Sequence, residues 1–188
     1  MLVAVLGGYG FTRDFPLEQI YRDNRLNMIH EGTAGIQSLD LLGRKTTMAR
    51  GEAFKLFISR VDEACTRTSE DVDIAPYANV LRETLGHLSS TTRYLTTRMM
   101  EGDAEAAMSN SHEYLNAVGH VTIAWMWLEQ AHAAKGQLSS GSDPDFLRGK
   151  VSAMKYFFDH ELVKVPAQCK ILQHSTVVHD LDVAQLLS

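Results

Sequence analysis

Apolar residues recur at helical spacing along most of the chain. Between residues 75 and 100 they alternate at intervals of four and three, the period of one helix face, and only Thr92 interrupts the row. Gly102-Asp103 should end this helix. A second helix is expected over about 103–135. Its centre, residues 121–128, is apolar nearly all round, so we expect several neighbouring helices to bury it.

A third long helix should begin at Asp143-Pro144, because an N-cap residue followed by proline is typical of a helix start. A polar loop over Gly136 to Ser142 precedes it. Pro166 lies inside the helical pattern and should kink the helix or split it in two, since proline has no N–H and clashes with the preceding turn. The predicted buried stripe consists of Leu147, Val151, Met154, Phe158, Leu162, Val165, Cys169 and Leu172.

Two shorter helices are expected before these. Thr33 is a good N-cap for a helix that should run to about Met48, with Ile36, Leu39 and Leu42 facing inward. Gly51 allows a bend, and a further helix is expected over roughly 52–68. Its apolar stripe contains Phe54, Phe57, Ile58, Val61 and Cys65.

The N-terminal stretch alternates glycine turns with helical pattern. Val3 to Leu6 should form the last turn of a helix or strand that Gly7-Gly8 stops, and Pro16 suits the first turn of a new helix. That helix should place Leu17, Ile20 and Tyr21 on one face. No strand pattern of any length and no long repeat is present, so the predicted fold is all-α, an antiparallel helical bundle.

Composition limits the classes of function. The 188 residues suffice for one domain, or one and a fragment, and the 45% hydrophobic and 22% charged residues are ordinary for a soluble globular protein. A net charge of −5 argues against a nucleic-acid partner. No signal peptide is visible, and the longest apolar run is far shorter than the about 20 residues of a membrane span. Cys65 and Cys169 form no CxxC pair, which favours buried free thiols in a reducing cytosol.

Glu31 is the strongest candidate for chemistry. It follows the apolar Met28-Ile29, precedes a glycine, and stands just ahead of the helix expected from Thr33, whose free N–H groups would favour developing negative charge. A carboxylate in an apolar pocket has its pKa raised, as a general base acting on carbon requires. The alternative is that Glu31 only precedes or caps a helix, as many exposed glutamates do.

Other constellations are weaker. Glu129-x-x-His132 has the spacing of a di-iron ligand pair, but no second ExxH occurs, so no metal site is expected. The Trp125-Met126-Trp127 cluster is typical of a helix core.

A family resemblance is carried by one stretch. The segment LGGYGFTRDFPLEQIYRD, followed by EGTAGIQ, resembles the last core segment of the flavin-dependent acyl-CoA dehydrogenases, with their GG-x-G turn, T-R-D-[YF]-P helix start and EGT-x-x-IQ motif. The continuation SLDLLGRK resembles the branch that includes 3-methylthiopropanoyl-CoA dehydrogenase, in which a long helical extension follows. The resemblance implies that residues 1–48 are the end of the helical core and residues 49–188 the C-terminal extension.

The resemblance also implies site roles. Glu31 would be the base that removes the α-proton of an acyl-CoA thioester while the β-hydride passes to FAD, and its backbone N–H would help hold the thioester oxygen. Gly32 would lie by the substrate, Thr33 and Gly35 against FAD, and Gly7 with Gly8 near the FAD of a neighbouring subunit. His30 and Gly35 stand where the family commonly has tyrosine and glutamine, so any contact at Gly35 would be made by backbone.

The function implied is that of the C-terminal part of an acyl-CoA dehydrogenase. Its partners would be an acyl-CoA, a second copy of the chain, and electron-transfer flavoprotein or a similar acceptor. With the family's N-terminal helices and central β-domain absent from the sequence, we expect the isolated chain to be inactive and to hold FAD weakly or not at all. The alternative is a helical assembly module that keeps the fold without the chemistry.

Overall fold

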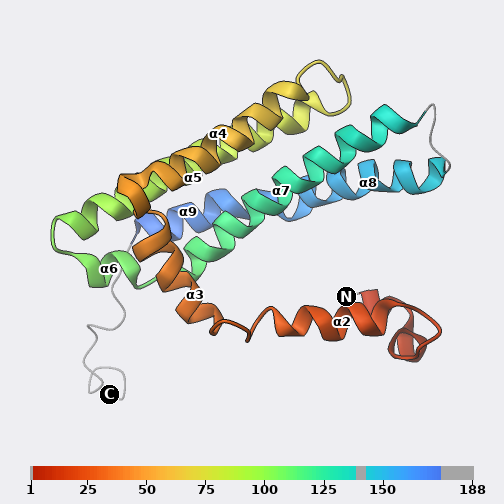
Figure 1. Ribbon diagram of the computed structural model, residues 1–188, viewed down its shortest axis with the longest axis horizontal. Coiled ribbons are helices and arrows are strands. Elements are labelled where there is room, and N and C mark those ends of the chain that lie inside the picture. The colour runs from red at the N-terminus through yellow and green to blue at the C-terminus, as the bar shows by residue number, and fades with distance from the viewer. Residues whose placement is uncertain (1, 139–142, 175–188) are drawn as a thin grey trace. The chain divides into compact units, whose positions relative to one another are not determined.

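The computed structural model describes residues 2–138 and 143–174, which form helices and turns with no strand among them (Figure 1). This confirms the all-α fold. The chain divides into two compact units, Met1–Ser38 and Leu39–Ser188. The family-based boundary after residue 48 stays a prediction.

The first unit consists of short helices. Its elements are α1 (Leu2–Val5), the 3₁₀ helix η1 (Gly7–Phe11) and α2 (Leu17–Leu26), and α3 (Ala34–Asp40) begins at its end. Gly7 adopts a φ of 58°, a left-handed conformation that suits glycine and ends α1 as expected. Pro16 directly precedes α2, whose Glu18 and Arg22 form the ion pair that their spacing favours. Of the apolar face of α2, Ile20 and Tyr21 are exposed and Leu17 is partly buried.

The second unit is a helical bundle. Figure 1 shows α4 and α5 side by side and α8 following α7 in the opposite direction. α4 ends at Arg67, one residue before the predicted end, and α5 has the predicted bounds. The elements are η2 (Leu41–Lys45), η3 (Met48–Gly51), α4 (Glu52–Arg67), α5 (Ala75–Met100), α6 (Ala104–Met108), α7 (Ser111–Gln137), α8 (Pro144–His160), η4 (Leu162–Lys164) and α9 (Val165–Gln173).

The start of α8 and the split at Pro166 are confirmed. Asp143 caps α8, because its side chain accepts a hydrogen bond from the Phe146 N–H at 3.0 Å. The helix ends at His160, the short η4 follows, and α9 then carries Pro166 in its first turn, where the missing N–H has no partner to lose. Residues 139–142 of the predicted polar loop lie outside the described residues.

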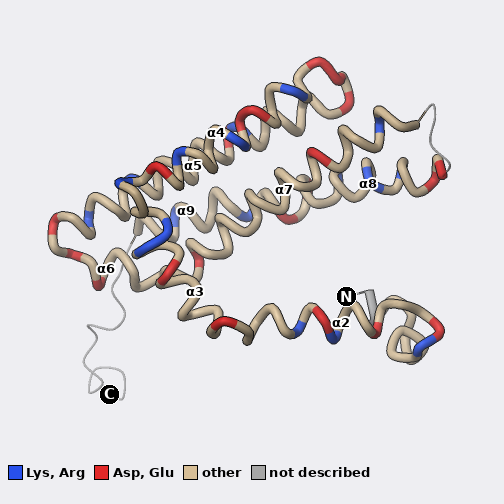
Figure 2. Tube along the Cα trace, viewed as in Figure 1, with Lys and Arg blue, Asp and Glu red and all other residues tan. Residues whose placement is uncertain are grey.

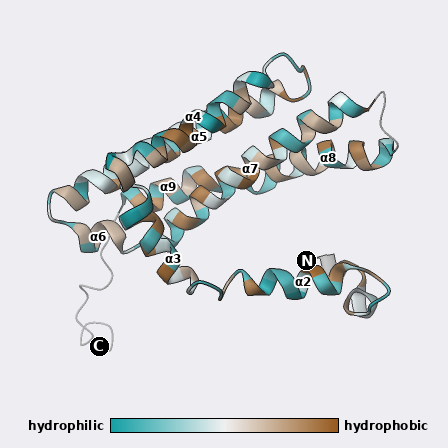
Figure 3. Cartoon of the chain, viewed as in Figure 1, coloured by the Kyte–Doolittle hydropathy of each residue, from teal (hydrophilic) through white to brown (hydrophobic). Residues whose placement is uncertain are grey.

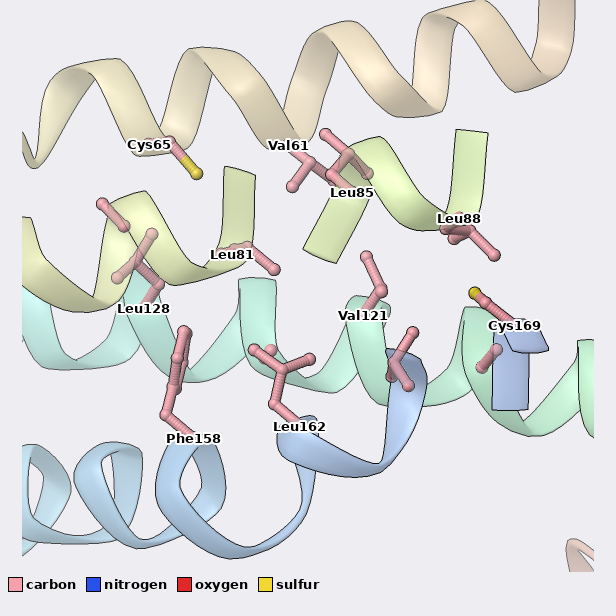
Figure 4. Close-up of a cluster of buried hydrophobic side chains, with 14 of the residues drawn as sticks. Val61, Cys65, Leu81, Leu85, Leu88, Val121, Leu128, Phe158, Leu162 and Cys169 are labelled. Carbon is pink, nitrogen blue, oxygen red and sulfur yellow. The ribbon is translucent and has the colours of Figure 1, made fainter. Parts of the chain in front are cut away.

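The core lies between α4, α5, α7, α8 and α9, and Figure 4 shows side chains from these helices meeting there. α7 runs through its middle and packs against all four others. Every predicted member of the stripe from Leu147 to Leu172 is buried except Val151, which is partly buried. Figure 3 shows hydrophobic and hydrophilic residues alternating along these helices, as one-sided burial requires. At the centre of α7, Ile123 and Met126 are exposed, so burial there is not all round.

The prediction of one helix over 33–48 was wrong. After α3 the backbone widens into a π turn at η2, where the Thr46 N–H donates to the Leu41 carbonyl at 2.9 Å. The Thr46 hydroxyl donates to the same carbonyl at 2.8 Å. This side-chain bond competes with regular α-helical pairing. Leu42 is fully buried as expected, but Ile36 and Leu39 are 59% and 44% exposed.

The prediction of one helix over 103–135 was also wrong, because α6 and α7 are separate. The break falls at Ser109 and Asn110, where the Ser109 hydroxyl donates to the Ala106 carbonyl at 2.8 Å and Asn110 leaves the helical backbone conformation. The short α6 can then turn Ala106 and Ala107 into the interior. Ser109 and Asn110 did not predict this break, because a pair of polar residues also occurs on the exposed face of a continuous helix.

Thr92 interrupts the leucine row of α5 because it takes part in a buried polar contact. Its hydroxyl lies 2.9 Å from the Tyr114 hydroxyl, which in turn lies 3.4 Å from the hydroxyl of Thr46. Tyr114 is fully buried, so these contacts satisfy a phenol that would otherwise lack a partner. Burial raises the pKa of Tyr114. This contact ties η2, α5 and α7 together.

Candidate active site around Glu31

The turn between α2 and α3 holds Glu31 in an unusual backbone conformation. Its φ is 58°, in the left-handed region that residues other than glycine rarely adopt, and the next residue, Gly32, has a φ of 113°. The Gln37 side chain donates a hydrogen bond to the Glu31 carbonyl at 2.6 Å, which pins the turn against α3. Sparsely populated conformations of this kind cluster at functional sites.

Gly32 is required here for steric reasons as well. A Cβ at this position would lie 3.1 Å from Cγ2 of Ile36, and the positive φ would strain any other residue. Glycine at this position therefore avoids both a close contact with Ile36 and backbone strain.

The groups of Glu31 that could act on a ligand are accessible. Its side chain is exposed, and its N–H makes no hydrogen bond to any residue that the structure describes. Met28 and Ile29 are 55% and 67% exposed, so these two side chains do not bury the carboxylate. His30 is turned toward α2, with Nδ1 at 3.2 Å from the Leu26 carbonyl.

The start of α3 agrees with the sequence. The Gln37 N–H donates to the Thr33 carbonyl at 3.0 Å, which makes Thr33 the first acceptor of the helix. α3 itself has only seven residues before the π turn. Its N-terminal N–H groups lie directly after Glu31, but the helix is shorter than the sequence predicted.

The positions expected to meet a flavin fall into two segments. Thr33 follows Glu31 and Gly32 in the turn, Gly35 lies in the first turn of α3, and both are exposed. Gly7 and Gly8 precede α2, and a Cβ at either would meet nothing within 4 Å. No hydrogen bond joins these two segments among the described residues. Their open backbone fits a bulky ligand approaching closely, as the resemblance implies for FAD.

The remaining sequence candidates have structural roles. Glu129 accepts a hydrogen bond from Nε1 of Trp125 at 3.2 Å and pairs with Arg67, which links α7 to α4. Trp125 and Trp127 are partly buried against the core. Cys65 and Cys169 are buried free thiols, as predicted. None of the described helices has the length and apolarity to cross a membrane.

One feature of the second unit has no recognisable signature in the sequence. A pocket of about 680 Å³ lies in the second unit between η3, α4 and α5. Its basic side chains, Arg50, Lys55 and Arg93, belong to no sequence motif, and only folding brings them together.

The motifs and the helical fold define a class of protein, and family comparison identifies it. A family model described as "Acetyl-CoA dehydrogenase C-terminal like" matches residues 57–181, and one described as "Acyl-CoA dehydrogenase, C-terminal domain" matches residues 1–47. The chain belongs to the acyl-CoA dehydrogenases and corresponds to their C-terminal part.

Individual relatives agree. The chain is 29% identical over 167 residues to 3-methylmercaptopropionyl-CoA dehydrogenase of Ruegeria pomeroyi, covering 88% of this chain and 28% of the relative. It is 29% identical over 163 residues to the broad-specificity linear acyl-CoA dehydrogenase FadE5 of Mycobacterium tuberculosis, covering 82% and 27%. A butyryl-CoA dehydrogenase of Syntrophomonas wolfei is 26% identical over 168 residues, with 82% and 26% covered. The chain thus spans about a quarter of the length of these relatives.

Proposed function

We propose that this chain provides the catalytic base of an acyl-CoA dehydrogenase, and that the base is Glu31. The observation that carries the proposal is the left-handed conformation of Glu31, at a φ of 58°, in the EGT motif where the family has its base. A non-glycine residue in this conformation stores roughly 1–3 kcal/mol of strain, which is typical of a position selected for function.

The chemistry assigned to Glu31 is proton abstraction from carbon. Its carboxylate takes the proton from the α-carbon of an acyl-CoA thioester, and the electron pair of that C–H bond becomes the second bond between the α- and β-carbons. The β-hydrogen leaves with its electron pair as a hydride. FAD, when bound, supplies the hydride acceptor and is thereby reduced.

The neighbouring residues would position the substrate. The free N–H of Glu31 would donate to the thioester oxygen and stabilise the negative charge that develops there as the α-proton leaves. Gly32 would let the thioester approach the backbone. Thr33 and Gly35 would lie against FAD, and Gly7 with Gly8 would approach the FAD of a neighbouring subunit, since their exposed backbone leaves room for it.

The domain assignment belongs to the same proposal. Residues 1–48 would complete the helical core of the enzyme and residues 49–188 would be its C-terminal extension. In the whole enzyme, parts beyond this chain would enclose the Glu31 carboxylate, which is exposed here. An electron-transfer flavoprotein or a similar acceptor would reoxidise the flavin.

The decisive experiment replaces Glu31 with Gln in the FAD-loaded enzyme that contains this chain. Glutamine keeps the size and the backbone N–H but cannot accept the proton. We expect anaerobic bleaching of the flavin by an acyl-CoA to slow by about 10⁴-fold, the upper end for general acid–base catalysis. Substrate affinity should change much less.

Glu83→Gln is the matched control, because Glu83 is an exposed glutamate on α5. It should bleach at the parent rate. The alternative function, an assembly module without chemistry, predicts that Glu31→Gln also bleaches at that rate, and this result would refute the proposal.

A further inference from the structure

The pocket of the second unit has the size of a small-molecule site. It lies between η3, the first half of α4 and the second half of α5, and its volume is about 680 Å³. Pockets for cofactors and other small ligands usually measure about 300–1,000 Å³. All of its walls come from one compact unit, so it exists independently of Glu31 and its turn.

The charged residues of the pocket have one sign. Arg50, Lys55 and Arg93 line it, and none of the described lining residues is acidic. Lys55 is neutralised by Glu52, whose carboxylate lies 2.8 Å from its Nζ. Neither Arg50 nor Arg93 forms an ion pair with any residue that the structure describes. Figure 2 shows acidic and basic residues interspersed along the rest of the bundle. The unmatched charge of the pocket therefore corresponds to two guanidinium groups.

The other lining residues are mostly apolar or carry a hydroxyl group. Phe54 and Ile58 of α4 form an apolar wall, and the exposed Met100 of α5 lies at the rim. The lining also includes Thr46 and Thr47, which directly precede η3, and Ser89, Thr92 and Thr96 of α5. The Thr92 hydroxyl donates to the Leu88 carbonyl and contacts the buried Tyr114 hydroxyl, which ties the α5 side of the pocket to the core.

The backbone presents Arg50 in a defined direction. Ala49, Arg50 and Gly51 have consecutive positive φ values of 50°, 61° and 86°, which turns the chain sharply into α4. Alanine and arginine are strained in this conformation. The turn brings Arg50 to the same cavity as Arg93, which lies far along the chain on α5.

We propose that this pocket binds a phosphate monoester that carries an aromatic body. A phosphate monoester has a charge of about −1.5 to −2 at neutral pH, which matches two unpaired guanidinium groups, whereas a carboxylate would leave one unmatched. Arginine also presents paired donors that fit phosphate oxygens. The wall of Phe54 and Ile58 offers an apolar surface for a flat ring, and inorganic phosphate alone would leave most of the cavity unfilled. The proposal does not involve Glu31, so its failure would leave the proposed function intact.

Binding of AMP and of phenyl phosphate to the full chain tests the proposal. We would follow it by calorimetry and by the methyl NMR signals of Ile58 and Met100, with Met126 of α7 as a reference outside the pocket. We expect both compounds to shift the pocket signals only. Adenosine lacks the phosphate, inorganic phosphate lacks the ring, and benzoate lacks the second negative charge. Each should therefore bind at least about tenfold more weakly.

Charge-removing variants then locate the site. Arg50→Gln and Arg93→Gln should each weaken AMP binding by about ten- to a hundredfold, the loss expected for charge-assisted hydrogen bonds. Arg60→Gln is the control, because Arg60 lies on α4 but outside the pocket and pairs with Glu63. Arg50 and Arg93 are both exposed, so their variants should keep the melting temperature of the parent protein.

Three results would overturn the proposal. The first is the absence of any shift of the Ile58 and Met100 signals at about 1 mM of either phosphate monoester, a concentration that detects even weak sites. The second is affinity for benzoate equal to that for phenyl phosphate. The third is AMP binding that Arg50→Gln and Arg93→Gln leave unchanged.

Discussion

At the scale of single residues, backbone strain coincides with both proposed sites. The described residues other than glycine with positive φ are Glu31, Ala49 and Arg50. Glu31 is the proposed base, and the other two form the turn that brings Arg50 to the pocket. Strained conformations persist only where the surrounding structure enforces them, and they concentrate at functional positions. Gln37 enforces the first turn, and the junction of η3 with α4 enforces the second.

Replacing Ala49 with glycine should stabilise the protein. Ala49 is exposed and has a φ of 50°, so its Cβ contributes strain and little packing. We expect a gain of about 1 kcal/mol in the free energy of unfolding, measured by urea denaturation. Ala133→Gly, in the next-to-last turn of α7 and also exposed, should instead lose about 1 kcal/mol, because glycine is a poor helix former. Equal losses in both variants would show that Ala49 is not strained.

The thiol of Cys65 should make stability depend on alkaline pH. Burial raises its pKa from 9.0 to about 11. The unfolded thiol therefore ionises first as the pH rises, which favours the unfolded state, while below about pH 9 both states keep the proton and the full stability is present. We expect the free energy of unfolding to fall by about 1 kcal/mol between about pH 8 and pH 10 through this group.

Cys65→Ala isolates that contribution. The variant should be less stable at every pH because it leaves a cavity, but its stability should fall less steeply as the pH rises. Cys169, whose pKa burial also raises, is present in both proteins and acts as a common background. Parallel stability curves for the parent and the variant would contradict the prediction.

At the scale of elements, the position where a helix begins affects its packing as much as the residues on its buried face do. Most described N-caps lack a side-chain hydrogen bond, whereas Asp143 accepts one from the N–H of Phe146. α8 must begin in register for its stripe from Leu147 to Phe158 to meet α7. The cap therefore contributes to packing as well as to local helix stability.

Removing this cap should lower the free energy of unfolding moderately, and another capping residue should restore it. Asp143→Ala should lower the free energy of unfolding by about 1 kcal/mol, because one N–H at the helix start loses its acceptor. Asp143→Asn should restore most of the loss, since asparagine is an equally good cap. Chemical denaturation of the three proteins measures both effects. If the Asn variant is as unstable as the Ala variant, the negative charge of Asp143, rather than its hydrogen bond, is responsible.

At the scale of the whole molecule, the first unit exposes large apolar side chains. Val5, Tyr9 and Phe11 are 75%, 69% and 69% exposed, and Ile29 is also mostly exposed. Large apolar side chains that stay exposed in such number can mark an interaction surface. In the proposed function this surface meets other parts of the enzyme or a second copy of the chain.

The isolated chain should therefore associate in solution. We expect light scattering to give the mass of a dimer or a larger species at micromolar concentrations, and Phe11→Ser to shift it toward the monomer. Val72→Ser is the control, because Val72 is exposed but lies in the turn before α5. A monomeric parent chain, or equal effects of the two substitutions, would contradict the prediction.

The sequence by itself determined the helices with long, regular patterns and the identity of the candidate base. The stripe from Leu147 to Leu172, the cap at Asp143 and the break at Pro166 depend on residues within a turn or two of one another, so local chemistry specifies them. The EGT motif led to Glu31 by resemblance, and its conformation gives that choice a physical reason.

Only the tertiary structure decided where the irregular backbone lies and which distant residues meet. The π turn at η2 accompanies the contact of Thr46 with Tyr114, and Gly43 lies close to Met108, where a Cβ would come within 3.0 Å of its Cε. Arg50 and Arg93 share a pocket because α4 packs on α5. Such features arise from contacts between residues far apart in the chain, which a pattern that repeats every few residues does not encode.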